Sequence, residues 1–437
     1  MKQRPPVSSV FGIGGNARNS QSYVDRGGLD QHLDYLLKTE RHIVIHGESK
    51  QGKSWLRARA IPDEASLVIQ CQPGMNIEGV FKDALGKLGI RAELKQTSQN
   101  NLEGSLEVTA SAEFSASFLA KLGFDTKAAG KKASGKQTET QAIGHTPADI
   151  AWISEIFKES GRRIVLEDFH YLTESARKSF AYVMKALGEY GVFVLIVGVW
   201  PQDHLLSYYN GDLDGRVEDI HLSWTRDELD SVLKKGCQAL SIGMTSSVRE
   251  YVISDSYSNV GLLQRLAERL CLEEGVAKKE SDEYLYITLG DSLDRARAAV
   301  ATGMRNRYKS FAEQFVQGIQ QAPDGANVYL CVLRAITDRS DDELAGGLVA
   351  TDILKSSTAG VESKSYANQI LSKIDQLQIN AGVKPAVLTY VEYSRRLFVI
   401  DTAFLFFRRY GSPVWPWDDQ DFEIMNDVVP SIVSETK

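Results

Sequence analysis

The chain has 437 residues, of which 43% are hydrophobic and 24% charged, so it is long enough for two or three globular domains. Its formal net charge of −7 argues against a protein that coats nucleic acid by charge alone, although a local basic face is compatible with it. The N-terminus lacks the apolar core of a signal peptide, and no run of about 18 apolar residues is present, which predicts a cytoplasmic protein without a membrane span.

The chain begins with a Gly-, Ser- and Asn-rich stretch over residues 1–20, which predicts a flexible N-terminus. Residues 25–38 place leucines on one face of a helix. A short apolar strand over 42–46 follows, and the segment 55–60 has the composition of a helix. Between this strand and this helix lies the most informative part of the sequence.

Residues 47–54 read G-E-S-K-Q-G-K-S and match the phosphate-binding loop G-x-x-x-x-G-K-[ST] at every fixed position. The glycines allow successive backbone N–H groups to face phosphate oxygens, and the following helix adds its positive dipole end. Lys53 is expected to reach the β- and γ-phosphates, and the Ser54 hydroxyl to coordinate Mg²⁺. We therefore predict ATP and Mg²⁺ as ligands, with binding residues Gly47, Glu48, Ser49, Lys50, Gln51, Gly52, Lys53, Ser54 and Trp55.

The alternation of strands and helices continues and is then interrupted. A strand at 67–71 and a helix at 77–88 precede a break over 92–145, in which 107–114 has the pattern of a strand and 127–142 is polar and low in complexity. A gap of this length predicts an insertion with a mobile tip, either solvated or in contact with nucleic acid or a partner. Thr146 and Pro147 then form an expected N-cap and first position of a helix over 148–158.

An acid pair follows the next buried strand. Residues 164–166 are apolar and β-branched, and Glu167 and Asp168 stand at the carboxyl end, where ligands bind in open α/β sheets. One acid would bind Mg²⁺ and the other would polarise the attacking water. By position Glu167 takes the metal role and Asp168 the role of base, but a register shift of one residue would exchange them. A helix over 173–190 and a strand over 192–199 complete a parallel sheet with helices on both faces.

The chain becomes helical after residue 200. Helices are expected over 227–240, 245–254 and 259–272, which is the size of a lid domain, and a longer helical region is expected over 292–321. Helices at 328–337, 341–348 and 364–378 then precede two apolar runs, 387–392 and 396–400, separated by a three-residue turn. Three helices followed by a hairpin are the plan of a winged helix, a helix-turn-helix variant. The tail, 411–437, is expected to pack back on the body.

With both motifs placed, residues 20–410 resemble the AAA+/STAND class of P-loop ATPases with a C-terminal winged helix, which includes archaeal-type and origin-recognition ATPases. The resemblance implies a P-loop core at 21–222 with an insertion at 92–145, a helical lid and connecting helix at 223–322, and a winged helix at 323–411, between a flexible 1–20 and a tail at 412–437. It also implies contacts of Tyr23 and Arg26 with the adenine side, Arg216 as an arginine finger and Arg265 as a second sensor. Arg216 can equally be a surface ion-pair residue, and His170 either senses the γ-phosphate or packs in the core.

The resulting expectation is an ATPase that acts as a switch, whose nucleotide state controls assembly or the engagement of a partner. By resemblance, such proteins serve in bacterial defence or in mobile-element systems, as homo-oligomers with a separate effector. The alternative is a DNA-handling ATPase whose winged helix binds duplex DNA through Lys364, Lys373, Arg395 and Arg396. Acidic neighbours dilute this basic face, so a winged helix that contacts only protein stays open as well.

Overall fold

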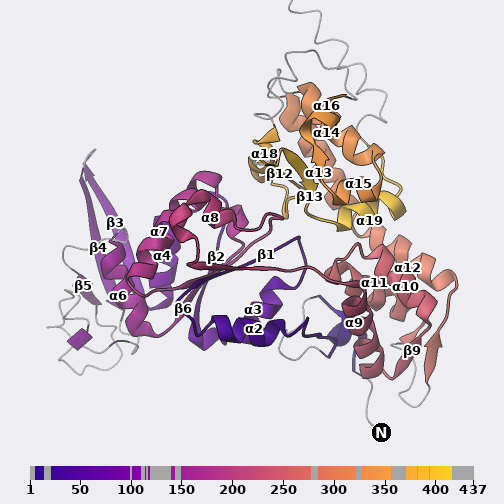
Figure 1. Cartoon of the computed structure of the whole chain (residues 1–437), viewed down its shortest axis with the longest axis horizontal. Helices are drawn as coiled ribbons and strands as arrows, with labels where there is room; N and C mark the ends of the chain where they lie inside the picture. The colour runs from indigo at the N-terminus through magenta and orange to yellow at the C-terminus, as the bar shows by residue number, and fades with distance from the viewer. Residues whose placement is uncertain are drawn as a thin grey trace, which may run out of the picture. The chain divides into compact units, whose positions relative to one another are not determined.

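The structure is a computed structural model, and it describes residues 5–13, 21–98, 101–109, 114, 117–118, 139–142, 149–276, 284–320, 326–355, 371–380, 382–392 and 394–415. The chain divides into two units (Figure 1). The first unit contains residues 1–24, 48–52 and 223–437, and the second contains residues 25–47 and 53–222. Among the described residues, no helix is long and apolar enough to cross a membrane.

The second unit is built on a parallel five-stranded sheet with the strand order β2-β6-β7-β1-β8. Its strands are β1 (His42–His46), β2 (Ser66–Gln70), β6 (Arg163–Glu167), β7 (Val194–Val197) and β8 (Val217–His221). Such strands have a near-continuous run of apolar residues because both faces of the sheet are covered. The sequence-based expectation of a parallel α/β sheet is therefore confirmed.

Successive residues of each strand enter two different cores. Ile43, Val165 and Leu195 pack with α2 (Leu29–Leu36) and α3 (Lys53–Ala60). Val44, Leu166 and Ile196 point the other way. They pack with a layer that includes α4 (Ile77–Lys87), α6 (Ile150–Ser160), α7 (Glu174–Glu189) and α8 (Leu205–Tyr209). Figure 1 shows α2 and α3 on one side of the sheet and α4, α7 and α8 on the other. The described residues of this unit also include short 3-10 turns at Asp63–Ala65, Phe169–Tyr171 and Gly211–Leu213.

The expected insertion is more regular than its composition indicates. A three-stranded antiparallel sheet contains β3 (Ile90–Ser98), β4 (Asn101–Thr109) and β5 (Glu139–Ala142), and β5 lies within the stretch expected to be low in complexity. Pairing with β4 supplies the backbone hydrogen bonds that make a polar segment a strand, so composition alone was a poor guide. The Lys-rich residues 127–138 lie outside the described residues, as do Thr146 and Pro147. The N-cap of α6 is Asp149, whose carboxylate accepts the Trp152 N–H, so the expected cap was wrong.

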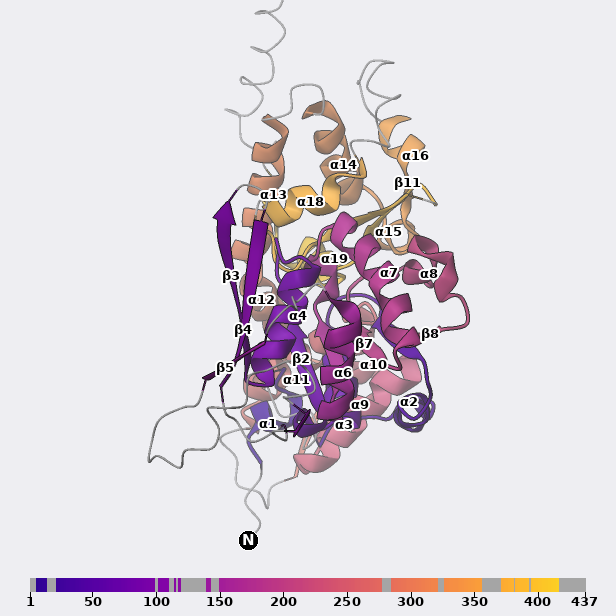
Figure 2. The same cartoon turned by 90° about the vertical axis from the view of Figure 1, so that its left-hand side faces the viewer.

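The first unit begins with a helix, where the sequence predicted a flexible segment. Helix α1 (Val7–Phe11) buries Val7, Val10 and Phe11. A Cβ added to Gly236 would lie 2.2 Å from the Phe11 ring, so this aromatic side chain packs directly on α9 (Arg226–Ala239). Both helices are labelled in Figure 2. Residues 14–20 lie outside the described residues.

The helices of the first unit between residues 226 and 320 lie close to their expected positions. They are α9, α10 (Ser246–Asp255), α11 (Val260–Glu273), α12 (Asp291–Thr302) and α13 (Arg305–Gln320). The expected helical region over 292–321 is present as two helices, α12 and α13, and Gly303 is the C-cap of α12. Two short parallel strands, β9 (Ile242–Met244) and β10 (Leu285–Ile287), were not anticipated.

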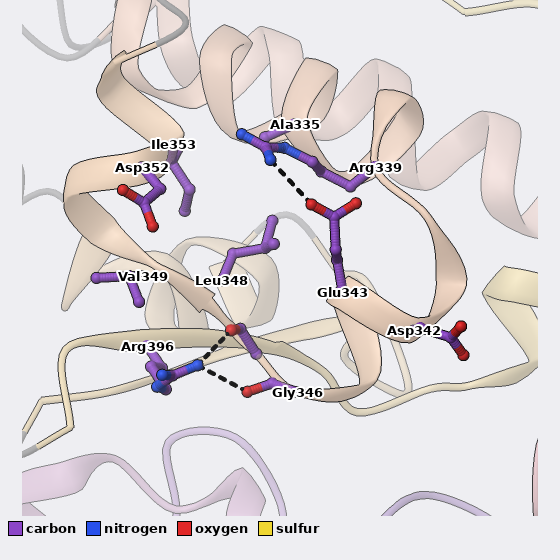
Figure 3. A pocket seen from close by; sticks show the side chains of 11 residues that line it. Ala335, Arg339, Asp342, Glu343, Gly346, Leu348, Val349, Asp352, Ile353 and Arg396 are labelled. Carbon is purple, nitrogen blue, oxygen red and sulfur yellow. Dashed lines mark hydrogen bonds and ion pairs between the residues drawn. The ribbon is translucent and has the colours of Figure 1, made fainter.

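The C-terminal part of the first unit contains α14 (Ala326–Asp338), α15 (Asp341–Ala345), β11 (Leu348–Val349), α16 (Ala350–Lys355), α18 (Ile374–Asn380), β12 (Leu388–Val391), β13 (Arg396–Val399) and α19 (Ala403–Tyr410). The expected hairpin is present: β12 and β13 pair antiparallel, and β11 adds to β13. The expected helix over 364–378 is described only as the shorter α18, because residues 356–370 lie outside the described residues. Arg396 donates to the carbonyls of Gly346 and Gly347 at 2.9 and 2.8 Å. Dashed lines from Arg396 mark these hydrogen bonds in Figure 3. Of the tail, Trp415 packs against Phe404.

Candidate nucleotide-binding site

The phosphate-binding loop has the backbone that its glycines predict. Strand β1 ends at His46 and helix α3 begins at Lys53, so the loop connects a strand to a helix N-terminus. Gly47 has a φ of +134°, and a Cβ there would lie 2.5 Å from the Leu222 carbonyl oxygen. Gly52 has a φ of +84°. Both positions therefore require glycine, the first for conformation and space and the second for conformation.

The side chains expected to handle phosphate and metal lie together in the second unit. Lys53 is buried, and its Nζ donates a 3.2 Å hydrogen bond to the Gly47 carbonyl. The Ser54 hydroxyl donates to Glu167 Oε2 at 2.8 Å, and Arg57 Nε donates to Glu167 Oε1 at 2.9 Å. Because Ser54 and Glu167 are the two oxygen ligands expected for Mg²⁺, this contact favours the metal role for Glu167. Arg57 was not identified from the sequence, although it lies one helical turn after Lys53.

Asp168 differs from Glu167 in conformation and environment. Its backbone is left-handed, with a φ of +57°. Burial and the neighbouring Glu167 carboxylate raise the pKa of Asp168, and Lys53 offsets part of this increase. A carboxylate with a raised pKa beside a buried lysine has the properties of a general base, and it is separate from the pair formed by Glu167 and Ser54.

One ring nitrogen of His170, which feels the charge of Lys53, is buried without a hydrogen-bond partner among the described residues. His170 Nδ1 accepts the Val199 N–H at 3.3 Å, so in the neutral ring Nε2 carries the proton. Nε2 is buried and makes no hydrogen bond with any of the described residues. Burial, followed by the charges of Lys53 and Arg177, lowers the pKa of His170 to about 3, so the ring is neutral at physiological pH. An unpaired buried donor of this kind is suited to an incoming anionic oxygen.

The tip of the loop, residues 48–52, belongs to the first unit and forms several hydrogen bonds there. The Ser49 N–H donates to the Ile400 carbonyl at 3.0 Å. The Lys50 carbonyl accepts the Gly261 N–H at 3.3 Å, and the Gln51 carbonyl accepts Trp224 Nε1 at 3.0 Å. The Ser49 N–H is a backbone donor of the kind that binds phosphate, and here it donates to the Ile400 carbonyl instead.

Asn259 connects this loop tip to two other parts of the first unit. Its Oδ1 caps α11 by accepting the Leu262 N–H at 2.9 Å. Its Nδ2 donates to the Ser49 carbonyl at 3.2 Å and to the Thr402 hydroxyl at 3.3 Å. Asn259 is fully buried, so each of these bonds replaces water that the amide has lost. The sequence placed Asn259 at the start of a lid segment but gave no sign of these contacts.

The other expected site residues are distributed over both units. Tyr23 and Arg265 belong to the first unit and are half-buried, and the Tyr23 carbonyl accepts Lys235 Nζ at 3.0 Å. Arg26 is buried in the second unit, and Trp55 is half-buried there on α3. Arg216 is exposed and forms a 2.7 Å ion pair with Glu189.

No protein-family model matches the chain, and no curated protein matches it. Among solved structures, a Walker-type ATPase of Pyrococcus abyssi is similar with a TM-score of 0.50 and 14% identity, over 91% of this chain and 99% of that one. The ORC1 protein of Aeropyrum pernix, solved in complex with DNA, gives 0.41 and 11% over 98% and 99% of the two chains. The RuvB Holliday junction branch migration motor of Thermotoga maritima gives 0.37 and 12% over 87% and 94%. Of these three, the Pyrococcus ATPase alone reaches 0.5, so the chain is shown to have the fold of a Walker-type P-loop ATPase.

Proposed function

We propose that the protein binds and hydrolyses ATP with Mg²⁺, and that the nucleotide acts as a switch on the first unit. The main support for a switch is the hydrogen bond that the Ser49 N–H donates to the Ile400 carbonyl. A phosphate bound in the loop competes for this donor, because successive N–H groups of such a loop face the phosphate oxygens. ATP would therefore replace the bond from the Ser49 N–H to the Ile400 carbonyl by a bond to phosphate. As the tip of the loop moves, the Ser49 and Lys50 carbonyls would lose the hydrogen bonds that they accept from Asn259 and Gly261. The resulting change in free energy favours a different arrangement of these segments.

The chemistry of hydrolysis is assigned to groups in the second unit. Lys53 binds the β- and γ-phosphates, Ser54 and Glu167 hold Mg²⁺, and Asp168 orients or deprotonates the attacking water. The neutral His170 donates its Nε2 proton to a γ-phosphate oxygen. In the same way as many such ATPases, the protein would use an arginine in trans, for which Arg216 is the candidate, in a homo-oligomer that engages a separate partner.

We further propose that residues 323–411 form a winged helix. Support comes from the sheet order β11-β13-β12, with helices before the hairpin β12–β13. In this arrangement β11, which precedes α16 and α18, pairs with β13, the second strand of the hairpin. The proposed role of the domain is to transmit the nucleotide state to a partner, since Ile400 directly follows β13.

The test of ATP binding is calorimetry on the parent protein and on Lys53→Ala, with Lys82→Ala as a matched control on the exposed face of α4. Loss of a charge-assisted contact of about 1.5–3 kcal/mol predicts an affinity about 10- to 150-fold weaker in Lys53→Ala. Lys82→Ala should bind as the parent does. An unchanged affinity in folded Lys53→Ala would overturn the assignment of the loop.

The test of the switch is hydrogen exchange at the Gly261 amide, which donates to the Lys50 carbonyl near the N-terminus of α11. A slowly hydrolysed ATP analogue should accelerate exchange at Gly261 in the parent and not in Lys53→Ala. If the analogue binds and Gly261 exchange is unchanged or slower, the loop keeps its contacts when nucleotide is bound, and the switch is overturned while ATP binding stands.

A further inference from the structure

A cluster of histidine and aspartate side chains lies behind the phosphate-binding loop, in the second unit. His46 is the last residue of β1, Asp219 and His221 are on β8, and Asp203 and His204 precede α8. His46 Nε2 is 3.3 Å from Asp203 Oδ1 and 3.7 Å from Asp219 Oδ1, and His221 Nδ1 is 3.1 Å from Asp203 Oδ1. The ligand atoms of His46, Asp203 and His221 all lie within 4.8 Å of one another.

The tautomer of His46 leaves a lone pair directed at these carboxylates. Its Nδ1 is 3.2 Å from the Trp200 carbonyl oxygen, which can only accept, so Nδ1 carries the proton of the neutral ring. The side chain is fully buried, and its Nε2 makes no hydrogen bond among the described residues. Nε2 then presents a lone pair toward oxygens that are themselves acceptors. Two of these acceptors, His46 Nε2 and the Asp219 carboxylate, are buried, and their proximity is costly unless a cation or a proton lies between them.

The two spacings that involve Asp203 Oδ1 fit one small ion, and the third, between the ligand atoms of His46 and His221, is at most 4.8 Å. In a tetrahedral zinc site the metal–ligand bonds are about 2.0–2.2 Å, which places neighbouring ligand atoms roughly 3.3–3.5 Å apart. The two contacts of Asp203 Oδ1, at 3.3 Å to His46 and 3.1 Å to His221, are close to this value. Two imidazoles and a carboxylate form a ligand set typical of Zn²⁺ and unlike the all-oxygen sets of Mg²⁺ and Ca²⁺.

Outer contacts also resemble those of a metal site. The bond from His46 Nδ1 to the Trp200 carbonyl fixes the ring orientation, and the His46 ring stacks on Trp200 with an interplanar angle of 3°. The side chain of Asp219 is 8% exposed, and its Oδ2 lies 3.2 Å from His204 Nδ1. This contact holds Asp219 beside the cluster, where its other oxygen faces His46.

We propose that His46, Asp203 and His221 bind a divalent transition metal of the Zn²⁺ class, with Asp219 or a water in the fourth position. The ion would tie the end of β1 to β8 and to the segment before α8. His46 directly precedes Gly47, so the ion would fix the point at which the strand enters the phosphate-binding loop. This site is distinct from the one for Mg²⁺ with ATP, which uses Ser54 and Glu167.

The test uses the untagged full chain, freed of metal with a chelator and then titrated with Zn²⁺ against a fluorescent zinc indicator. One Zn²⁺ should bind per chain, excess Mg²⁺ should not displace it, and Zn²⁺ should raise the melting temperature. His221→Ala and Asp203→Ala each remove a ligand from an exposed position, with side chains 44% and 57% exposed, so both should fold. Loss of an outer-shell partner costs roughly 10- to 100-fold in metal affinity, and loss of a ligand should cost at least as much.

His32→Ala is the matched control, because His32 is an exposed histidine of the same unit outside the cluster. It should bind Zn²⁺ as the parent does. Co²⁺ in place of Zn²⁺ should give the visible absorption of a tetrahedral ion in the parent and lose it in His221→Ala. The proposal is overturned by an absence of Zn²⁺ binding at micromolar concentration, by displacement with Mg²⁺, or by equal binding to the parent and both ligand variants. Circular dichroism of the metal-free variants and the parent confirms that the variants are folded, independently of ATP binding.

Discussion

The Ser54 hydroxyl donates a 2.8 Å hydrogen bond to Glu167 Oε2, joining the end of the phosphate-binding loop to the carboxyl end of β6. Both oxygens are of the kind that Mg²⁺ binds in proteins, and here they are adjacent with only a proton between them. Arg57 holds the other Glu167 oxygen, which fixes the orientation of the carboxylate. Sequence order alone left the roles of Glu167 and Asp168 interchangeable. This contact now favours Glu167 as the metal ligand.

Glu167→Gln should reduce ATP turnover and raise the Mg²⁺ concentration needed for half-maximal rate, because an amide is a weaker ligand than a carboxylate. ATP binding should change little, since Lys53 and the loop amides are intact. The measurement is the steady-state rate against Mg²⁺ concentration. Ser54→Ala should show the same change in Mg²⁺ dependence, and an unaltered Mg²⁺ dependence in both variants would place the metal elsewhere.

Asp168→Asn should reduce turnover without changing the Mg²⁺ dependence. In the parent, the rate should fall as the pH is lowered through the pKa of Asp168, because the ionised form is the base. The usual pKa of an aspartate is about 4, and burial and the Glu167 carboxylate raise the pKa of Asp168 above it. The fall in rate at low pH should therefore occur at a higher pH than for an ordinary aspartate. Asp168→Asn should lose this fall in rate. A pH profile that keeps the same fall in the variant would exclude Asp168 as the group that titrates.

Variants of Arg216 test whether one subunit contributes an arginine to the ATP site of another. Arg216→Ala and Lys53→Ala should each be inactive alone, and mixing them should restore part of the activity if Arg216 acts in trans. Glu189→Ala is the control, because it breaks the 2.7 Å ion pair with Arg216 and keeps the arginine. Activity retained in Glu189→Ala and restored by mixing supports the finger. If mixing restores nothing in intact assemblies, Arg216 is an exposed ion-pair residue, whose contribution to stability is small.

The proposed winged helix allows a specific test for duplex DNA. Lys373 and Arg395 are exposed, whereas Arg396 holds the Gly346 and Gly347 carbonyls (Figure 3) and would perturb the fold if reversed. The useful variant is therefore Lys373→Glu with Arg395→Glu. If the domain binds DNA, affinity should fall steeply with salt in the parent and be lost in this variant. Absence of binding at low salt, or binding indifferent to the two reversals, favours a domain that contacts protein.

Phe11 provides a prediction about stability. Its ring is fully buried on Gly236 of α9, so Phe11→Ala should lower the free energy of unfolding by about 3–5 kcal/mol. Ile13→Ala is the control, since Ile13 is 40% exposed and should cost little. Denaturant unfolding of the two variants measures the difference. Equal stability of Phe11→Ala and the parent would show that α1 is not part of the folded unit in solution.

The parallel sheet and the loop could be predicted because their signals are local. Strands such as β1 and β6 are buried on both faces and have uninterrupted apolar runs, and the loop has a fixed spacing of glycines, lysine and serine. Helix α1 and strand β5 could not be predicted in this way. The first is five residues long and depends on α9 and α11, and the second is polar and depends on β4.

Sequence patterns could not predict the contacts of the candidate sites either. Asn259 meets Ser49 over 210 positions of the chain, and His46 meets Trp200 over 154. Neither pair has a spacing that any motif contains. The proposed metal site in addition combines an aspartate and two histidines from three separate segments, whereas the known sequence signatures for zinc depend on ligands a few residues apart.

The membership of residues 48–52 in the first unit has a practical consequence for anyone who divides this protein. A fragment that ends at Leu222 contains every residue of the phosphate-binding motif, yet it lacks Trp224, Asn259, Gly261 and Ile400, which hold the tip of the loop. In such a fragment the tip of the loop would lack these hydrogen bonds. The measured affinity for nucleotide would then be that of a loop that is not bonded to the rest of the first unit. Measurements meant to describe the natural protein therefore need the chain at least through α19.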